Sequence, residues 1–420
     1  MSPRDLSRDG GDNGEGGGQP LYDCVIVGGG PAGATAADDL ARQGLRIALL
    51  DRDGRIKPCG GAIPPRAIDM FEIPEDLLVA RITKARMISP KGARVVIPIK
   101  DGFVGMVDRE VFDEWLRTRA AEHGAERHTG TYQRIEREAD GTARVVYRPK
   151  AAGHDGEAVA LRTRFVIGAD GANSTVARQE VPGSEELRTV IAYHEIVESP
   201  ADPAADFEAD RCDVYYDGRI SPDFYGWVFP HGPCTSVGMG TETPSFGVKK
   251  ATSALRDMAG LAEARTIRRE GAPIPLKPLS NWDNGRDVVL AGDAAGVVAP
   301  SSGEGIFYAM FGGRIAAGAV AEALAARSPA AAGRALSRTR KRFMRAHGGV
   351  FWILGLMQDY WYGSDDRRER FVHLCRDVDI QELTFDAYMN KELVKARPIA
   401  HVRIFARNIA HLTGLAKVSS

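Results

Sequence analysis

Apolar residues along the chain gather in short runs that alternate with polar segments of helix length. Residues 22–27 and 46–50 form two such runs, and the first leads directly into a cluster of glycines. Short, nearly continuous apolar runs are typical of strands that are buried on both faces of a parallel sheet. Residues 34–43 lie between the runs and have helical spacing, so the pattern predicts a strand–helix–strand unit whose second strand ends on Asp51.

The same patterns predict the elements further along the chain. We expect a helix over 109–123, capped by Asp108, that buries Val111, Phe112, Trp115 and Leu116. The other predicted elements are strands through 125–168 and 188–242, a helix over 248–263, a strand near 273–276, a buried strand ending at Gly292 and Asp293, and a helix from Gly305 to about 327.

The first strand–helix–strand unit and the strand that ends at Gly292 and Asp293 are far apart in the chain but chemically alike, since each combines a buried apolar strand with glycine and a carboxylate. One nucleotide-binding domain with a sheet-rich insertion explains this best. We therefore predict an α/β fold: a Rossmann-like domain interrupted by a mainly antiparallel β-sheet substrate domain, with a helical C-terminal region. The predicted parts are a disordered leader (1–20), the discontinuous nucleotide-binding domain (21–60, 108–187 and 277–345), the substrate-binding domain (61–107 and 188–276) and the C-terminal region (346–420).

Composition narrows the range of partners. The chain has 420 residues and a formal charge of −1, so we expect no nucleic-acid partner. Its five cysteines lack CxxC or CxxH spacing, which indicates a reducing compartment and no metal site. The longest apolar run, 350–357, is far shorter than the roughly 20 residues of a spanning helix, so we expect a cytoplasmic protein that does not cross a membrane.

The first strand–helix–strand unit carries a complete dinucleotide fingerprint. Gly28 permits a tight turn, Gly30 lets the backbone approach a pyrophosphate, and Gly33 lets the helix pack close to the strand. The N-terminus of the following helix supplies N–H groups and a positive dipole for phosphates. Asp51, at the end of the second strand, is placed to accept a hydrogen bond from a ribose hydroxyl.

Two further carboxylates follow glycine-bounded buried strands, Asp170 and Asp293. Either one alone is typical of an ordinary turn. In this order along the chain, however, the three motifs resemble the FAD-binding pattern of the aromatic hydroxylase-like flavoproteins, over roughly residues 21–330.

This resemblance implies FAD as the cofactor. The fingerprint glycines and Asp51 would hold the ADP half, Arg109 would lie near the flavin phosphates, and Asp293 would bind the ribityl chain. A helix that begins at Gly305 would point its positive end at the flavin ring. Arg109 has an alternative interpretation as a solvated first-turn arginine. The full set of expected cofactor residues is Gly28, Gly30, Pro31, Ala32, Gly33, Asp51, Arg52, Arg109, Asp170, Gly292, Asp293, Gly303, Gly305 and Ile306.

Two motifs indicate a subfamily. Residues 57–64 read KPCGGAIP, and residues 222–230 read PDFYGWVFP. Both resemble the geranylgeranyl reductases, flavoenzymes that hydrogenate isolated double bonds of prenyl chains. Strand alternation places Tyr225, Trp227 and Phe229 on one face, where they would line a prenyl site together with Gly60 and Gly61; ordinary core packing is the alternative.

The reaction needs an acid, and the motifs offer two candidates. Cys59 would donate a proton or position a donor beside the flavin, and a water held near Tyr225 is the other candidate. A buried, inert cysteine is the alternative for Cys59. We expect His231 to be exposed and not to act as a proton relay. The remaining cysteines, Cys24, Cys212, Cys234 and Cys375, are interpreted as structural.

The C-terminal region resembles one branch of that family. Residues 347–362 and 383–391 are similar to the chlorophyll-type geranylgeranyl reductases of photosynthetic organisms, in particular to bacterial members that act on geranylgeranyl-bacteriochlorophyll. The resemblance implies an enzyme that saturates three double bonds to give phytyl, with NADPH as donor and geranylgeranylated bacteriochlorophyll or geranylgeranyl diphosphate as substrate. An FAD-dependent monooxygenase and a non-catalytic prenyl carrier are the alternatives on the same fold.

The tail itself predicts contact with a membrane. Residues 395–417 combine apolar positions at helical spacing with basic residues on an adjoining face, and 338–342 add a basic cluster. Basic amphipathic helices commonly lie in the headgroup region of anionic membranes. Docking of the apolar face on the protein's own domain is the alternative. We expect a cytoplasmic protein that is peripheral on the photosynthetic (intracytoplasmic) membrane.

Overall fold

The structure is a computed structural model that describes residues 20–52, 56–100, 102–152, 156–200, 206–381, 389 and 391. The predicted leader before residue 20, the amphipathic tail over 395–417 and most of the motif at 383–391 lie outside the described residues. Within them, no helix is long and apolar enough to span a membrane.

A parallel sheet forms the centre of the first layer, in the order β8–β2–β1–β10–β16. Its strands are β1 (Leu21–Val27), β2 (Ile47–Asp51), β8 (Glu126–Arg137), β10 (Val159–Gly168) and β16 (Val288–Leu290). The apolar runs of β1 and β16 are almost completely buried, as strands covered on both faces must be. The outer parts of β8 and β10 extend beyond this sheet and pair antiparallel with β9 (Ala143–Pro149).

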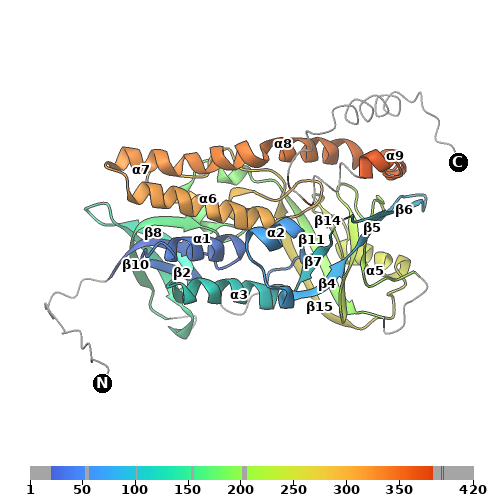
Figure 1. The fold of residues 1–420 in the computed structure, drawn as a ribbon, viewed down its shortest axis with the longest axis horizontal. Helices are drawn as coiled ribbons and strands as arrows, with labels where there is room; N and C mark the ends of the chain where they lie inside the picture. Colours follow the sequence, from blue (N-terminus) through green and yellow to red (C-terminus); the bar gives the residue numbers. More distant parts are fainter. Residues whose placement is uncertain are drawn as a thin grey trace, which may run out of the picture.

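Helices cover this sheet. Helix α1 (Pro31–Ala41) packs between α3 (Arg109–Glu122) and α6 (Ile306–Leu324), and the long α8 (Arg338–Trp361) lies beyond α6 (Figure 1). The approach of α6 to α1 is very close, since a Cβ on Gly313 would lie 2.1 Å from the Ala32 carbonyl oxygen. The remaining helices are α2 (Pro65–Met70), α4 (Thr175–Glu180), α5 (Val248–Met258), α7 (Pro329–Leu336) and α9 (Asp365–Leu374).

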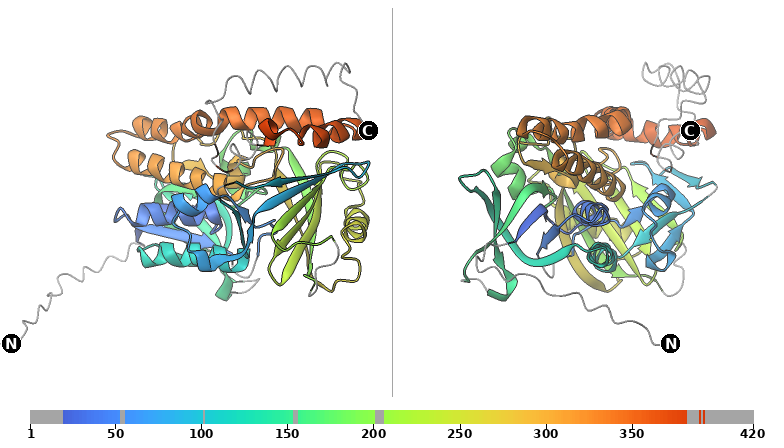
Figure 2. Two further views of the ribbon diagram at one scale, coloured as in Figure 1. Left: turned by 45° about the vertical axis from the view of Figure 1, so that its right-hand side comes forward. Right: turned by 60° about the vertical axis from the view of Figure 1, so that its left-hand side comes forward.

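A seven-stranded sheet stands beside the parallel sheet, with α5 on its far side (Figure 2). Its order is β15–β11–β14–β13–β12–β5–β6, and every pair is antiparallel except β12 with β5. Its strands are β5 (Lys84–Ile88), β6 (Arg94–Pro98), β11 (Thr189–Glu198), β12 (Arg211–Tyr215), β13 (Gly226–His231), β14 (Cys234–Thr241) and β15 (Thr266–Pro275). A third, small sheet lies between the two large sheets. It consists of β3 (Ala62–Ile63), β7 (Val104–Val107) and β4 (Leu78–Ile82).

The architecture confirms the predicted fold class: an interrupted nucleotide-binding fold, a mainly antiparallel sheet and a helical C-terminal region. The exact domain boundaries stay predictions. Several details differ from expectation. Helix α1 begins at Pro31, because proline fits the first helical position, and strand β15 begins at Thr266, well before 273. Val111 is 56% exposed, so the buried face of α3 is narrower than predicted and consists of Phe112, Leu116 and Ala120.

Candidate functional site

Two fingerprint glycines are required by the protein's own backbone. Gly28 has a φ of +106°, and a Cβ there would lie 2.3 Å from the Ala169 carbonyl oxygen. A Cβ on Gly33 would lie 1.8 Å from the Gly28 carbonyl oxygen, because α1 passes directly over the turn. These contacts give the tight turn and the close helix–strand packing that the spacing predicts.

Gly30 is different. Its φ of −74° is accessible to any residue, and a Cβ built on it would meet no atom within 4 Å. Gly30 is also the N-cap of α1, where no side chain caps the free N–H groups. Open space over an uncapped helix N-terminus fits a phosphate group, so the residues present are compatible with the pyrophosphate of FAD.

The predicted ribose carboxylate lies at the edge of this space. Asp51 forms an ion pair with Arg117 at 3.4 Å, and Arg117 also donates to the Gly29 carbonyl oxygen at 3.2 Å. Burial raises the pKa of Asp51, although Arg117 opposes that shift. Sequence reasoning missed Arg117, which faces Asp51 from two turns into α3. Arg52, also expected at the cofactor, is exposed.

The second predicted carboxylate, Asp293, lies close to the start of α6. It is 7% exposed, and a Cβ on Gly305, the N-cap of α6, would be 3.8 Å from its Oδ1. Gly292 has a φ of +65° and passes so close to Ala32 that a Cβ would lie 2.7 Å from the alanine methyl. The structure thus brings both glycine-rich segments together. Lys57, which the sequence interpretation did not use, forms an ion pair with Asp293.

Asp170 has a structural partner. Its Oδ1 accepts from Ser174, the N-cap of α4, and its Oδ2 accepts from the backbone N–H groups of Thr175 and Val176, so it holds the first turn of α4. Burial raises its pKa, and these hydrogen bonds oppose the shift. Its contact with a cofactor stays a prediction.

Arg109 is not a solvated arginine. It is 5% exposed, and Nε and Nη2 donate to the two carboxylate oxygens of Asp113 at 2.8 and 2.7 Å. Burial alone would lower the pKa of Arg109, but Asp113 and the thiol of Cys59 raise it above its ordinary value. The guanidinium therefore stays charged beside Cys59.

The turn that follows Cys59 lies flat against β13. The Gly61 N–H donates to the Cys59 sulfur at 3.4 Å, and a Cβ on Gly60 would lie 3.2 Å from the Phe229 ring. Gly61 has a φ of +70°, and a Cβ there would lie 2.6 Å from Nε2 of His231. Glycine at both positions thus lets the turn approach the aromatic strand.

Tyr225, directly before β13, shares one face with Trp227 and Phe229 of β13, as predicted. The Tyr225 and Trp227 ring centroids lie 6.0 Å apart, and those of Trp227 and Phe229 lie 6.3 Å apart. This row, here called the aromatic wall, also packs against Tyr216 and Phe224 of the neighbouring core. Tyr225 and Trp227 are buried in that core, and Phe229 is half-buried beside the Cys59 turn.

A hydrogen-bonded chain fixes the centre of the aromatic wall. Trp227 Nε1 donates to Ser236 Oγ at 3.0 Å, Ser236 contacts His194 Nδ1 at 2.9 Å, and His194 Nε2 contacts Glu270 at 2.9 Å. Neutral His194 with its proton on Nε2 satisfies every link, because Ser236 can then donate to Nδ1. The indole orientation is therefore set by buried polar groups on the same face of the sheet as the wall.

Tyr225 contributes its hydroxyl to the loop before α6. The hydroxyl donates to the Ser302 carbonyl oxygen, and Gly303, with a φ of +64°, lies where a Cβ would be 3.5 Å from that hydroxyl. Burial raises the pKa of Tyr225 well above its ordinary value. Ile306, the first residue of α6, is buried. The predicted cofactor loop and the predicted substrate strand are therefore in contact.

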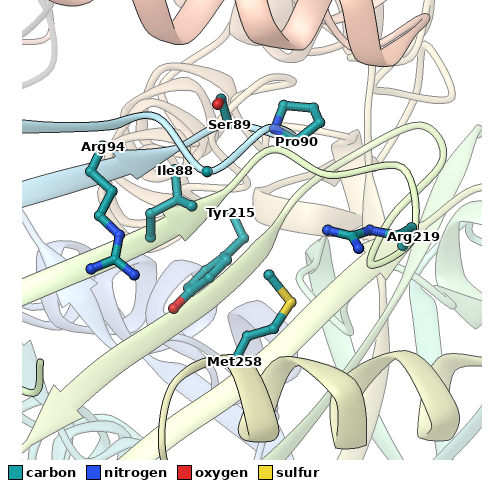
Figure 3. A pocket seen from close by; sticks show the side chains of 8 residues that line it. Ile88, Ser89, Pro90, Arg94, Tyr215, Arg219 and Met258 are labelled. Carbon is teal, nitrogen blue, oxygen red and sulfur yellow. The ribbon is translucent and has the colours of Figure 1, made fainter.

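His231 is not exposed, so that expectation was wrong, while the absence of a relay role stays a prediction. Its ring is half-buried, its Nδ1 donates to the Phe229 carbonyl oxygen at 2.9 Å, and burial lowers its pKa. It lines a cavity of about 110 Å³ together with Cys59, Arg109 and Cys234. A larger pocket, of about 210 Å³, lies on the α5 side of the sheet (Figure 3). Its two arginines are paired with Asp206 and Asp217, and none of the predicted site residues lines it.

Comparison with known proteins identifies the family. Residues 22–346 match the FAD binding domain family. The chain is 61% identical over 394 residues to geranylgeranyl diphosphate reductase of Rhodobacter capsulatus, covering 94% of this chain and 98% of that protein. It is 36% identical to geranylgeranyl diphosphate reductase of Synechocystis, covering 92% of this chain and 97% of that protein.

Among solved structures, a geranylgeranyl bacteriochlorophyll reductase-like protein from Thermoplasma acidophilum superposes with a TM-score of 0.76. The match covers 91% of this chain and 100% of that protein at 23% identity, which establishes a common fold. The extended sequence identity establishes more than the fold. The chain belongs to the geranylgeranyl reductase family of FAD-dependent oxidoreductases.

Proposed function

We propose that this protein hydrogenates three double bonds of a geranylgeranyl chain to give phytyl, with NADPH as the electron donor. The prenyl chain is carried by bacteriochlorophyll or by a diphosphate, as the names of the relatives suggest. One observation carries the proposal: the Cys59 turn is packed against the aromatic wall at Phe229, and Tyr225 of the same wall contacts the loop before α6. An apolar substrate surface and the predicted cofactor loop therefore adjoin.

The chain's own residues would hold and orient FAD. Open space at Gly30 and the free N–H groups of α1 suit its pyrophosphate, Asp51 suits a ribose hydroxyl, and Asp293 suits a ribityl hydroxyl. Bound FAD supplies hydride chemistry. Lys57 pairs with Asp293 and would hold its carboxylate in place for a ribityl hydroxyl.

Alkene reduction places a hydride on one carbon and a proton on the other. An unactivated alkene accepts hydride poorly, so the proton must come before or together with the hydride. We assign the proton to Cys59, whose sulfur is held by the Gly61 N–H and lies beside Arg109. The competing donor is a water near Tyr225. The Tyr225 hydroxyl already donates its hydrogen bond to the Ser302 carbonyl oxygen, so it can orient a water only by accepting a hydrogen bond from it.

The experiment that tests this function is an anaerobic incubation of the flavin-loaded protein with NADPH. Geranylgeranyl diphosphate and geranylgeranylated bacteriochlorophyll are supplied in separate reactions, and the molecular masses of the products are measured by mass spectrometry. We expect masses that rise in three steps of two hydrogens for one of the two substrates. Reduced flavin with no change in the mass of either substrate would contradict the proposal. Product that forms only in a parallel reaction with oxygen would favour the monooxygenase.

We further propose that the protein is peripheral on an anionic membrane and contacts it through one face of α8. Lys341, Arg345, Trp352 and Leu356 are separated by four, seven and four residues, which places them on one helical face. Trp352 is 70% and Leu356 is 56% exposed, and both basic residues are exposed as well. Cations attract anionic headgroups, while an exposed tryptophan suits the interface, so the face has the chemistry of a membrane-resting helix.

Vesicle sedimentation tests this face. Wild type and Leu356→Glu are mixed with phosphatidylserine-containing vesicles and with purely zwitterionic ones. Val111→Glu on α3 is the matched control, because Val111 is also 56% exposed. We expect binding to anionic vesicles that falls only in Leu356→Glu and weakens with salt. Equal binding by all three proteins would exclude α8 as the contact.

A further inference from the structure

The loop before α6 is held from outside by three distant segments of the chain. Tyr362, at the end of α8, donates its hydroxyl to the Ser301 carbonyl oxygen at 2.8 Å. Tyr225 of the aromatic wall donates to Ser302. The third contact comes from Lys391, whose ammonium donates to Glu304 Oε2 at 2.7 Å. Each of the three contacts fixes a different residue of the loop.

The contact between Lys391 and Glu304 is a buried ion pair. Lys391 is 1% and Glu304 is 7% exposed. The other carboxylate oxygen of Glu304 accepts from the Phe307 N–H at 3.1 Å, in the first turn of α6. The ammonium also stands 5.8 and 5.6 Å from the ring centroids of Phe307 and Tyr308. One carboxylate therefore joins Lys391 to the start of α6.

The residue two positions earlier anchors the same segment elsewhere. Met389 packs against an apolar cluster around Met106 and Cys212, and Phe229 of the aromatic wall packs against that cluster too. Lys391 thus contacts the predicted cofactor loop, and Met389 contacts the surroundings of the predicted prenyl site.

We propose that Lys391 is a positioning residue of the cofactor site, which neutralises Glu304 and thereby fixes the loop and the first turn of α6. The inference rests on the proposed function, in which α6 points its N-terminus at the flavin. Without the cation, the Glu304 carboxylate either turns towards solvent or stays as an uncompensated buried charge. Turning out would remove the bond to Phe307, and staying would place an uncompensated negative charge at the positive end of α6.

The flavin midpoint potential distinguishes Lys391 from an ordinary structural lysine. An uncompensated Glu304 would disfavour added electron density on a flavin bound at this helix end, so the flavin midpoint potential falls when the cation is removed. Simple loosening of the C-terminal segment would weaken binding without requiring a lower potential. The damage is also conditional on Glu304, because a neutral side chain there needs no cation.

The test compares Lys391→Met, Glu304→Gln and the double variant, with Lys249→Met on the exposed start of α5 as the control. FAD dissociation constants and flavin midpoint potentials are measured for each. We expect Lys391→Met to raise the dissociation constant about tenfold and to lower the potential, and Lys249→Met to match wild type. In the double variant, Glu304→Gln should restore most of the FAD affinity and most of the midpoint potential that Lys391→Met loses. The proposal would be overturned if the losses of FAD affinity and midpoint potential in the double variant were the sum of those in the single variants. It would also be overturned if Lys391→Met matched wild type in both measurements.

The proposal can still be tested if a variant folds poorly or FAD does not bind. Thermal unfolding of the apoproteins measures the same coupling without cofactor: the double variant should be more stable than Lys391→Met alone. If the double variant is as unstable as Lys391→Met, the pair does not act as proposed. If wild type fails to bind FAD while the coupling in unfolding persists, the proposed function fails and the ion pair between Lys391 and Glu304 stands.

Discussion

Replacement of Gly30 by alanine should separate cofactor binding from folding. The new methyl group has no neighbour within 4 Å, and the φ of −74° suits alanine. Loss of glycine at an N-cap costs roughly 0.5–1 kcal/mol, while the reduced entropy of the unfolded chain returns about 0.4–1 kcal/mol. The two effects nearly cancel, so we expect the Tm of the apoprotein to stay within about 2 °C of wild type.

FAD binding by Gly30→Ala should nevertheless fall. The methyl group fills the space where the backbone would meet the pyrophosphate, and overpacking of this kind costs about 1–3 kcal/mol, or roughly 5- to 150-fold in Kd. The loss is measured by fluorescence titration of the apoprotein with FAD. Gly33→Ala is the contrasting control, because its Cβ would lie 1.8 Å from the Gly28 carbonyl oxygen and must displace backbone.

Two results would refute the reasoning about these glycines. Unchanged FAD affinity in Gly30→Ala would mean that no ligand occupies the space over the start of α1. A Gly33→Ala apoprotein as stable as wild type would mean that the close contact with Gly28 is not present in solution. The expected pattern is a stable Gly30→Ala that binds FAD weakly and a Gly33→Ala with a Tm clearly below wild type.

Three further variants test other parts of the site. Cys59→Ala should retain FAD, seen as unchanged flavin absorbance, and lose most alkene reduction; full turnover would exclude Cys59 as the donor. Asp51→Asn should weaken FAD binding but stabilise the apoprotein at neutral pH, because burial raises the pKa of Asp51. That gain in stability should be absent below the ordinary carboxylate pKa of about 3.9, grow as the pH rises and level off above the pKa of Asp51 in the folded protein. Thermal unfolding at a series of pH values measures the gain. A gain that does not depend on pH would exclude the raised pKa of Asp51 as its cause. Ser236→Ala should cost about 1–3 kcal/mol in unfolding free energy by leaving Trp227 Nε1 without its acceptor, and a wild-type Tm would mean the indole finds another.

Sequence patterns predict the fold well where apolar periodicity and buried strands coincide. Strands β1, β2 and β16 were predicted because each is a short apolar run that ends in glycine or aspartate. Periodicity could not place β5 and β6 beside β12, because the pairing of distant strands leaves no local pattern. It also misplaced Val111, which has helical spacing with the buried face but lies at its outer edge.

The site could be predicted only as far as motifs reach. Glycine and aspartate at strand ends pointed to the cofactor region, but Arg117 and Lys57, which pair with Asp51 and Asp293, belong to no recognised spacing. His231 was expected to be exposed because nothing local indicates that Gly61 would pack against its ring. Such partners are set by tertiary contact.

Charge at the site is arranged in pairs, which explains why net charge says little about it. Asp51 pairs with Arg117, Asp293 with Lys57, Glu304 with Lys391 and Arg109 with Asp113. Each pair largely cancels its own field at a distance. The local attraction for an anionic cofactor then comes from oriented backbone groups, above all those at the uncapped start of α1. A ligand that binds there gains from the helix dipole while the paired side chains provide directional hydrogen bonds, so recognition depends on the shape of the glycine turn more than on net charge.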